Sequence, residues 1–244
     1  MTLPIPIVVF EDIDSTNAEA RRRAEGGETG PIWFTAARQS AGRGRRGRVW
    51  DTSLGNLAAT YLFTTAKTPG EAAQISFVAA LAVADLASAF APAELVTLKW
   101  PNDTLIAGRK AAGILVESAP APGAGLWVAV GIGINLAHAP QGLAPPALAP
   151  TYLGERGSTP TPAEALAGLS EAFERWRAIW QDDGFAAIAA AWTARAHGLG
   201  ERCVARLPNE TIEGIAEGLD VDGALRLRTP DGSVRRLTAG DVFF

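Results

Sequence analysis

The sequence has little cysteine and little histidine. One cysteine, Cys203, and two histidines, His138 and His197, occur among 244 residues. A single cysteine excludes an intramolecular disulfide and a cysteine-rich zinc cluster, and it is typical of a protein in a reducing compartment. The fold therefore has to be stabilised by its hydrophobic core and not by disulfide or zinc cross-links.

Long uninterrupted hydrophobic runs are also absent. The longest apolar stretches, residues 78–91 and 124–137, contain Asp85 or several glycines and fall short of a membrane span. The N-terminal segment MTLPIPIVVF has no basic residues and no small-residue cleavage site, so it does not resemble a secretory signal. We expect a cytoplasmic protein that has no membrane partner.

The charge balance argues against a protein that binds duplex DNA through bulk positive charge. The chain has 26 acidic and 22 basic residues, a net charge of -4, and 48% of its residues are hydrophobic. That hydrophobic fraction supports a substantial core, which argues against disorder. Lysine is scarce, because only Lys67, Lys99 and Lys110 stand beside 19 arginines. A lysine against this background indicates a position that requires a compact ammonium charge.

The hydrophobic patterns predict an α+β protein. Strands are expected over residues 5–10, 32–36, 56–65, 95–100, 104–106, 111–117 and 126–134, and helices after Asp14 and over 71–90, 163–182 and 185–197. Thr16 and Glu19 have the spacing of a capping box. Because several strands follow one another in hairpins, the sheet should be antiparallel or mixed. Beyond Gly198, short alternating runs separated by turn residues predict a small β-barrel.

The most unusual segment is GRGRRGR, residues 42–48, which we call the arginine loop. Its glycines allow backbone N–H groups to approach phosphate oxygens, and its arginines offer forked donors and positive charge. The segment fits the GxGxxG pattern, but no helix is predicted to follow it, so we reject a dinucleotide-binding turn. Taken alone, a solvated basic loop or an RNA contact explains the segment at least as well.

A second segment, KWPND at residues 99–103, is followed by a predicted hairpin and by GRKAAGI at residues 108–114. The hairpin would bring Lys99 and Lys110 close together. Placing two ammonium groups beside a carboxylate, an amide and an aromatic ring is costly unless an anion binds there. A β-turn with surface lysines is an equally good account of this segment alone.

Two further segments carry polar groups at the predicted ends of a strand and a helix. The strand GIGIN, residues 131–135, has two glycines that suit the close approach of a flat ligand or of another backbone, but a bulge with a turn-forming Asn135 is an equal alternative. The segment Ser15-Thr16-Asn17 has hydroxyl and amide groups, and by itself it is an ordinary helix cap.

Taken together and in this order, these segments resemble the biotin protein ligase family, and the resemblance covers nearly the whole chain. The arginine loop and KWPND are its most specific parts. The resemblance implies a catalytic domain over residues 1–197 with a mixed sheet, related to class II aminoacyl-tRNA synthetases. It also implies an SH3-like β-barrel over residues 198–244.

The same resemblance implies a two-step ligase reaction. Biotin and ATP form biotinoyl-AMP and pyrophosphate, with Mg²⁺ as the metal, and a lysine of a biotin carboxyl carrier domain then receives the biotinoyl group. The implied acceptor is the carrier protein of acetyl-CoA carboxylase or of a similar carboxylase. Some family members form homodimers, and the sequence leaves the oligomeric state and the metal ligands open.

The resemblance also implies roles for individual residues. Those expected to contact biotin are Ser15, Thr16, Asn17, Gln39, Gly42, Arg43, Gly44, Arg45, Lys110 and Gly113. Those expected to contact ATP or the adenylate are Arg43, Arg45, Arg48, Trp50, Asn102, Lys110 and Asn135. Lys110, Arg45 and Asp103 are the expected catalytic residues, of which Asp103 would orient the acceptor lysine or a metal.

Three alternatives bear on this reading. Some family members carry an N-terminal helix-turn-helix repressor domain, but only fourteen residues precede Ser15, so we expect a ligase that does not bind DNA. A lipoate protein ligase has a similar fold and the same adenylate chemistry, although the arginine loop favours biotin. A nucleic-acid-binding module that uses the arginine loop is the alternative from another class, and the net charge of -4 weighs against it.

Overall fold

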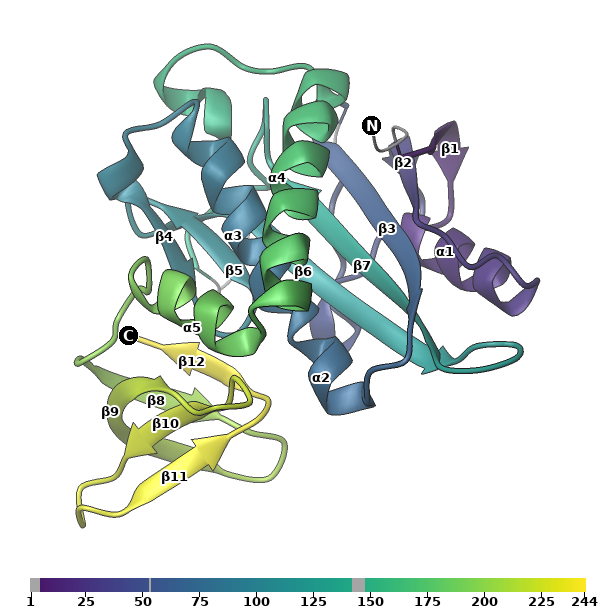
Figure 1. Ribbon diagram of the computed structural model, residues 1–244. Helices are drawn as coiled ribbons and strands as arrows, with labels where there is room; N and C mark the ends of the chain where they lie inside the picture. The colour runs from purple at the N-terminus through teal and green to yellow at the C-terminus, as the bar shows by residue number, and fades with distance from the viewer. Residues whose placement is uncertain (1–4, 53, 142–147) are drawn as a thin grey trace.

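The structure is a computed structural model that describes residues 5–52, 54–141 and 148–244. It contains a seven-stranded sheet covered by helices and a separate five-stranded sheet formed by the C-terminal segment (Figure 1). The predicted α+β class is confirmed.

The larger sheet is mixed, as expected. Its spatial order is β1 (Ile7–Ile13), β2 (Ile32–Gln39), β3 (Leu57–Thr65), β7 (Leu126–Ile134), β6 (Arg109–Pro120), β5 (Asp103–Ile106) and β4 (Val96–Lys99). Only β1 and β2 are parallel, and each other neighbouring pair is antiparallel. The central strands β3 and β7 are apolar on both faces because helices cover the sheet on both sides.

Five α-helices surround this sheet in the described part of the chain. They are α1 (Thr16–Glu25), α2 (Pro69–Ala73), α3 (Ile75–Ser88), α4 (Pro162–Asp182) and α5 (Phe185–Thr193). Helices α3 and α4 pack together on one face, and α1 packs against β3 and β7 on the other (Figure 1). The short 3-10 turns are Arg45–Gly47, Ala93–Leu95 and Leu153–Arg156.

The stretch Pro69–Ser88 is long and apolar enough to pass a membrane-span test by length and composition. However, 67% of its most apolar window is buried inside the protein, which is the pattern of a core helix. It consists of α2 and α3, which are separated at Gln74, whereas the sequence pattern predicted one helix over 71–90.

Two local predictions were wrong. Thr16 does not form a capping box with Glu19, because Ser15 is the N-cap residue and the Thr16 hydroxyl donates to the side chain of Gln39. Helix α5 ends at Thr193 and does not continue to His197. Residues 141–162 are rich in proline and glycine, which predicts a loop, and this stretch includes residues 142–147, which lie outside the described residues.

The C-terminal sheet is antiparallel throughout. Its order is β11 (Val234–Leu237), β10 (Leu225–Arg228), β9 (Thr211–Leu219), β8 (Arg202–Arg206) and β12 (Asp241–Phe243). The sequence pattern had not predicted β12. The sheet docks on the larger domain through Gly223, whose carbonyl accepts a 3.1 Å hydrogen bond from Trp100 Nε1. A Cβ on Gly223 would lie 2.8 Å from the ring of Phe77, so this turn approaches the core closely.

Candidate active site

A cavity of about 370 Å³ lies where the start of α1, the arginine loop, β6, β7 and β12 meet. It is lined by every residue that the sequence had assigned to the site except Gly42. These residues are Ser15, Thr16, Asn17, Gln39, Arg43, Gly44, Arg45, Arg48, Trp50, Asn102, Asp103, Lys110, Gly113 and Asn135. Motifs up to 120 positions apart in the chain therefore meet in one place.

One end of the cavity is a cluster of neutral hydroxyl and amide groups, which we call the hydroxyl-amide cluster. Gln39 Oε1 accepts from the backbone N–H and the hydroxyl of Thr16, at 2.8 and 3.1 Å. Gln39 Nε2 donates to the hydroxyl of Thr52 at 2.9 Å. The fully buried Thr60 lies 2.8 Å from the Thr16 hydroxyl. The cluster presents polar groups without a formal charge, which suits a neutral ligand that both donates and accepts.

Asn17 is held by contacts at both ends of its side-chain amide. Its Oδ1 accepts from Thr60 at 2.7 Å, and its Nδ2 donates to Glu117 at 2.7 Å. A Cβ at Gly131 would lie only 2.1 Å from Asn17 Oδ1, so this position of the amide requires a glycine. The first glycine of the GIGIN segment is thus explained by a side chain of the protein itself.

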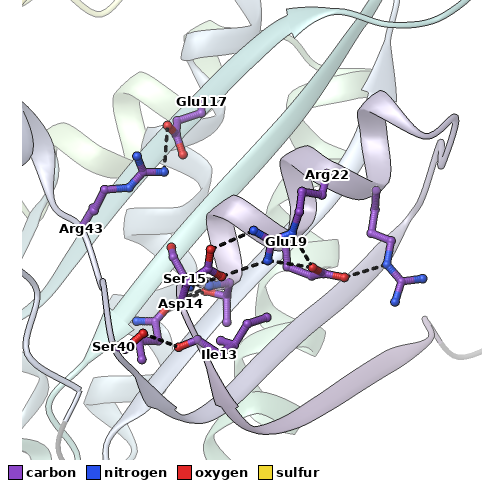
Figure 2. Close-up of polar contacts among 11 residues, drawn as sticks. Ile13, Asp14, Ser15, Glu19, Arg22, Ser40, Arg43 and Glu117 are labelled. Atoms are coloured by element: carbon purple, nitrogen blue, oxygen red, sulfur yellow. Dashed lines mark hydrogen bonds and ion pairs between the residues drawn. The ribbon is translucent and has the colours of Figure 1, made fainter.

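The chain enters this cluster through a charged turn before α1 (Figure 2). Asp14 accepts two hydrogen bonds from the guanidinium of Arg22, at 2.8 and 2.9 Å, and one from the backbone N–H of Ser15, at 2.7 Å. The Arg22 contact lowers the pKa of Asp14 to about 2. Figure 2 also shows Arg43 of the arginine loop facing Glu117, with a nitrogen-oxygen distance of 3.9 Å.

The other end of the cavity is cationic. Lys110 Nζ lies 2.6 Å from Oδ1 of Asp103, and both residues come from the β5–β6 hairpin. Lys99 is only 5% exposed, and its ammonium group lies 5.9 Å from the ring centroid of Phe243. Burial lowers the pKa of Lys99, although the nearby carboxylate of Asp103 opposes this effect. The prediction that the hairpin brings both lysines to one site is confirmed, since both line the cavity.

The arginine loop is closed at its base by short-range contacts. Arg43 and Val49 form an antiparallel bridge, and Trp50 N–H donates to the Gly42 carbonyl at 3.0 Å. A Cβ on Gly42 would lie 2.5 Å from the Trp50 carbonyl oxygen, so Gly42 shapes the base of the loop and does not line the cavity. The tip is a 3-10 turn in which Arg46 has a φ of 56°.

Trp50 lies against a patch of the sheet that has no side chains, which we call the glycine patch. Gly113 of β6 and Gly133 of β7 are directly paired across the two strands. A Cβ on Gly133 would lie 2.2 Å from the indole of Trp50, and one on Gly113 would lie 3.0 Å from it. Lys110 Nζ is 5.7 Å from the indole centroid. The second glycine of the GIGIN segment therefore admits a flat aromatic group close to the strand.

Two asparagines occupy fixed positions near the cations. Asn102 Nδ2 donates to the Ile114 carbonyl at 2.7 Å, and Asn102 Oδ1 accepts from Arg45 at 3.1 Å. Asn135 Nδ2 donates to the Thr151 carbonyl at 2.9 Å. Because both amides are anchored by backbone groups, their orientation in the cavity is defined before any ligand binds.

Comparisons with known proteins agree with this geometry. Residues 9–135 match the biotin/lipoate A/B protein ligase family, and residues 198–244 match the biotin protein ligase C-terminal domain. The chain is 47% identical over 235 residues to the biotin–acetyl-CoA-carboxylase ligase of Paracoccus denitrificans, covering 95% of this chain and 97% of the relative. It belongs to the biotin protein ligase family.

Further relatives extend this result. The enzyme of the same name from Mycobacterium tuberculosis is 34% identical, with 96% of this chain and 87% of the relative covered. The biotin protein ligase from Aquifex aeolicus in complex with biotin and ATP shares the fold, with a TM-score of 0.81 at 24% identity over 98% of this chain and 97% of that chain. The predicted membership in the family is thus confirmed.

Several cavity residues of this biotin protein ligase were missed from the sequence. Asp241 and Phe243 reach the cavity from β12, and Lys99 lines it from the end of β4. Thr60 of β3 is buried and bonds to Thr16 in the hydroxyl-amide cluster. Lys99 was not assigned to either substrate, although the sequence predicts it close to Lys110 and it is one of three lysines in the chain.

Proposed function

We propose that this ligase joins biotin to AMP and then transfers the biotinoyl group to a lysine of a carrier domain. The observation that supports this most directly is the division of the cavity. A neutral hydroxyl-amide cluster lines one part of it, and Lys99, Lys110, Arg45 and Arg48 line another. A ligand with a polar uncharged ring and a carboxylate at the end of an apolar chain matches both ends.

Ser15, Thr16, Asn17 and Gln39 would hold the ureido ring of biotin. A ureido ring has two N–H donors and one carbonyl acceptor, and hydroxyl and amide side chains can satisfy both kinds of group. Glu117 and Thr60 bond the amide of Asn17, so the orientation of its Nδ2 donor and its Oδ1 acceptor is already fixed. The ring would bind without a large rearrangement of these side chains, which reduces the entropic cost of binding.

In the first step, a carboxylate oxygen of biotin attacks the α-phosphorus of ATP. A new oxygen–phosphorus bond forms, the bond to the β-phosphate bridging oxygen breaks, and pyrophosphate leaves. A carboxylic acid with a pKa of about 4 is already ionised at neutral pH, so no general base is needed. The obstacle is repulsion between two anions, and Arg43, Arg45, Arg48 and Lys110 would reduce it.

In the second step, a neutral lysine amine of the acceptor attacks the biotinoyl carbonyl carbon. An amide bond forms, the bond to AMP breaks, and the amine loses a proton. The carboxylate of Asp103 lies beside the ammonium group of Lys110, and it would orient the incoming amine. Trp50 would cover the adenine or the adenylate, since its ring already lies against Gly133 of β7.

Mg²⁺ is expected with ATP, and the donor chemistry of the cavity fits it. Magnesium is commonly held by one or two protein oxygens together with phosphate oxygens and water. The described residues contain no group of three or more His, Cys, Asp or Glu that could form an all-protein site. Asp103, with the amide oxygens of Asn102 and Asn135, would hold the ion beside the phosphates, where its charge neutralises phosphate oxygens.

The wider setting is part of the same proposal. The acceptor would be a carrier domain of acetyl-CoA carboxylase or a similar carboxylase, in the cytoplasm, and self-association as a homodimer is compatible with the family. We place the division between the catalytic and C-terminal domains at residues 197 and 198. The match of residues 198–244 to a biotin protein ligase C-terminal domain supports this division.

The two alternatives are not favoured. The C-terminal match is to biotin protein ligases, and two relatives named as biotin–acetyl-CoA-carboxylase ligases match over 97% and 87% of their own length. An RNA-binding module would need the arginine loop to be free, but Arg45 and Arg48 are bonded within the protein.

Isotope exchange between pyrophosphate and ATP tests the first step. We expect exchange that depends on biotin and on Mg²⁺ and that is not supported by lipoate. Exchange with lipoate in place of biotin would contradict the proposal.

A further inference from the structure

The arginine loop is attached to the C-terminal domain by an acidic residue. Arg48 Nη2 donates to both carboxylate oxygens of Asp241, each at 2.7 Å. Arg46 Nη1 lies 3.3 Å from Oδ2 of the same carboxylate. One carboxylate on β12 thus binds two guanidinium groups of a loop that is almost 200 positions earlier in the chain.

The neighbouring backbone binds a third arginine. Arg45 Nη2 donates to the Gly240 carbonyl at 3.0 Å, and Arg45 Nη1 donates to Asn102 Oδ1 at 3.1 Å. Arg45 therefore spans the gap between β12 and the KWPND segment of the catalytic domain. Burial lowers the pKa of Arg45. Because the ordinary pKa of arginine is far above neutral pH, the guanidinium stays charged.

Asp241 is ionised where it lies. Its side chain is 21% exposed, and burial alone would raise the pKa of its carboxyl. The hydrogen bond from Arg48 and the charges of Arg45 and Arg46 outweigh burial, so the pKa is below its usual range. A charged acid therefore lines the cationic end of the cavity.

Without this carboxylate the loop would repel itself and its surroundings. Its four arginines lie in seven residues, and Lys99 and Lys110 line the same cavity. Like charges at such separations disfavour a closed loop, especially where burial reduces screening. The carboxylate of Asp241 offsets part of this repulsion through its contacts with Arg46 and Arg48.

Resting on the function proposed above, we infer that Asp241 is a positioning residue for ATP activation. Its carboxylate holds Arg46 and Arg48 against β12, and this keeps Arg45 beside Asn102 over the nucleotide end of the cavity. A guanidinium has five N–H donors, and the contact to Asp241 uses only Nη2 of Arg48. Arg48 can therefore hold Asp241 and a phosphate oxygen at the same time.

The hydroxyl-amide cluster and Asp241 depend on different contacts. The hydroxyl-amide cluster is bonded through Thr16, Gln39, Thr52 and Thr60 within the catalytic domain. Asp241 has its hydrogen bonds to Arg46 and Arg48. Loss of Asp241 should therefore weaken ATP use and adenylate retention more than it weakens biotin binding.

The test compares Asp241→Asn with Glu217→Gln. Glu217 is an acid of the same domain that pairs with Arg226 and Arg228 on β10, so it controls for a general loss of charge there. For Asp241→Asn we expect the KM for ATP to rise about 10-fold, as for loss of a charge-assisted hydrogen bond, and free biotinoyl-AMP to escape faster. The Kd for biotin should change less than the KM for ATP, and Asp241→Glu should restore most of the ATP effect.

Trypsin digestion of the ligand-free protein gives a readout that needs no activity. Cleavage after Arg43, Arg45, Arg46 or Arg48 should be faster in Asp241→Asn than in the wild type and Glu217→Gln. Arg48→Gln removes the same contact from the other side, so its cleavage after the remaining loop arginines should also accelerate. Thermal unfolding of each variant identifies any that fail to fold. If either Asp241→Asn or Arg48→Gln fails to fold, the other variant is compared with the wild type.

The outcomes distinguish the inference from the proposed function. If the wild type shows biotin-dependent exchange but Asp241→Asn has an unchanged KM for ATP and unchanged loop cleavage, the inference is wrong and the function stands. If the wild type shows no such exchange, the function is wrong, and trypsin alone decides whether Asp241 holds the loop.

Discussion

Nζ of Lys110 lies 2.6 Å from Oδ1 of Asp103, and both residues line the cationic end of the cavity. The pair is part of the β5–β6 hairpin, which is anchored when the Lys110 N–H donates to the Ala149 carbonyl at 2.8 Å. A hydrogen bond thus fixes the backbone of Lys110, and a carboxylate holds its ammonium group. It can shift from Asp103 to an incoming carboxylate or phosphate without leaving the cavity.

Replacing Lys110 should therefore abolish the first step. We expect Lys110→Ala to reduce biotin-dependent exchange of pyrophosphate with ATP by at least about 100-fold, because its ammonium charge offsets the repulsion between the two reacting anions. Lys67, which lies 4.8 Å from the ring of Trp180 and outside the cavity, provides the matched control as Lys67→Ala. Unchanged exchange in Lys110→Ala would remove this residue from the mechanism.

Arg45 should be needed to retain the intermediate more than to form it. It bridges Asn102 and the Gly240 carbonyl across the cavity, so its loss opens the loop over the adenylate. We expect Arg45→Gly to form biotinoyl-AMP but to release it to solution, where water hydrolyses it. Chromatography of the reaction mixture would detect free biotinoyl-AMP. Retention of a tight complex by this variant would show that other contacts hold the intermediate.

The two glycines of β7 give a matched pair of substitutions on one strand. A Cβ at Gly131 meets the Asn17 amide at 2.1 Å, whereas a Cβ at Gly133 meets the Trp50 indole at 2.2 Å. We expect Gly131→Ala to raise the KM for biotin and Gly133→Ala to raise the KM for ATP, each by about 10-fold or more, because each displaces a different site residue. Equal effects of both variants on both substrates would indicate general damage to the sheet.

The turn before α1 should lose stability in acid. The pKa of Asp14 is lowered to about 2, so its stabilising contribution is complete above the ordinary carboxyl value of about 4 and is lost as pH falls through 2. In Asp14→Asn, the fall in the free energy of unfolding between pH 7 and pH 2.5 should be smaller than in the wild type. The difference should be modest and weaker in high salt, because the Asp14–Arg22 pair is about half exposed. A difference that does not depend on pH would contradict this origin.

Much of the site could be predicted because its chemistry lies in short, unusual segments. The arginine loop, KWPND and the polar residues before α1 each had an ordinary alternative, and only their combination in order favoured one site. Strand β7 was predicted with its observed limits, since its apolar run is bounded by clear turn residues.

Tertiary packing explains what the sequence could not predict. Thr16 has capping-box spacing with Glu19, yet Gln39, 23 positions away, accepts its hydroxyl hydrogen bond instead. The glycine patch under Trp50 depends on the register of β6 and β7, which pairs Gly113 with Gly133. Asp241 belongs to a strand of three residues near the chain end, and no local pattern places it beside the arginine loop.

Transfer of labelled biotin to a carrier-domain lysine tests the central claim most directly. The purified protein, ATP, Mg²⁺ and a biotin carboxyl carrier domain should give a labelled domain whose mass increases by one biotinoyl group. The same domain with its acceptor lysine replaced by arginine should remain unlabelled. Labelling with lipoate and not with biotin would contradict the account.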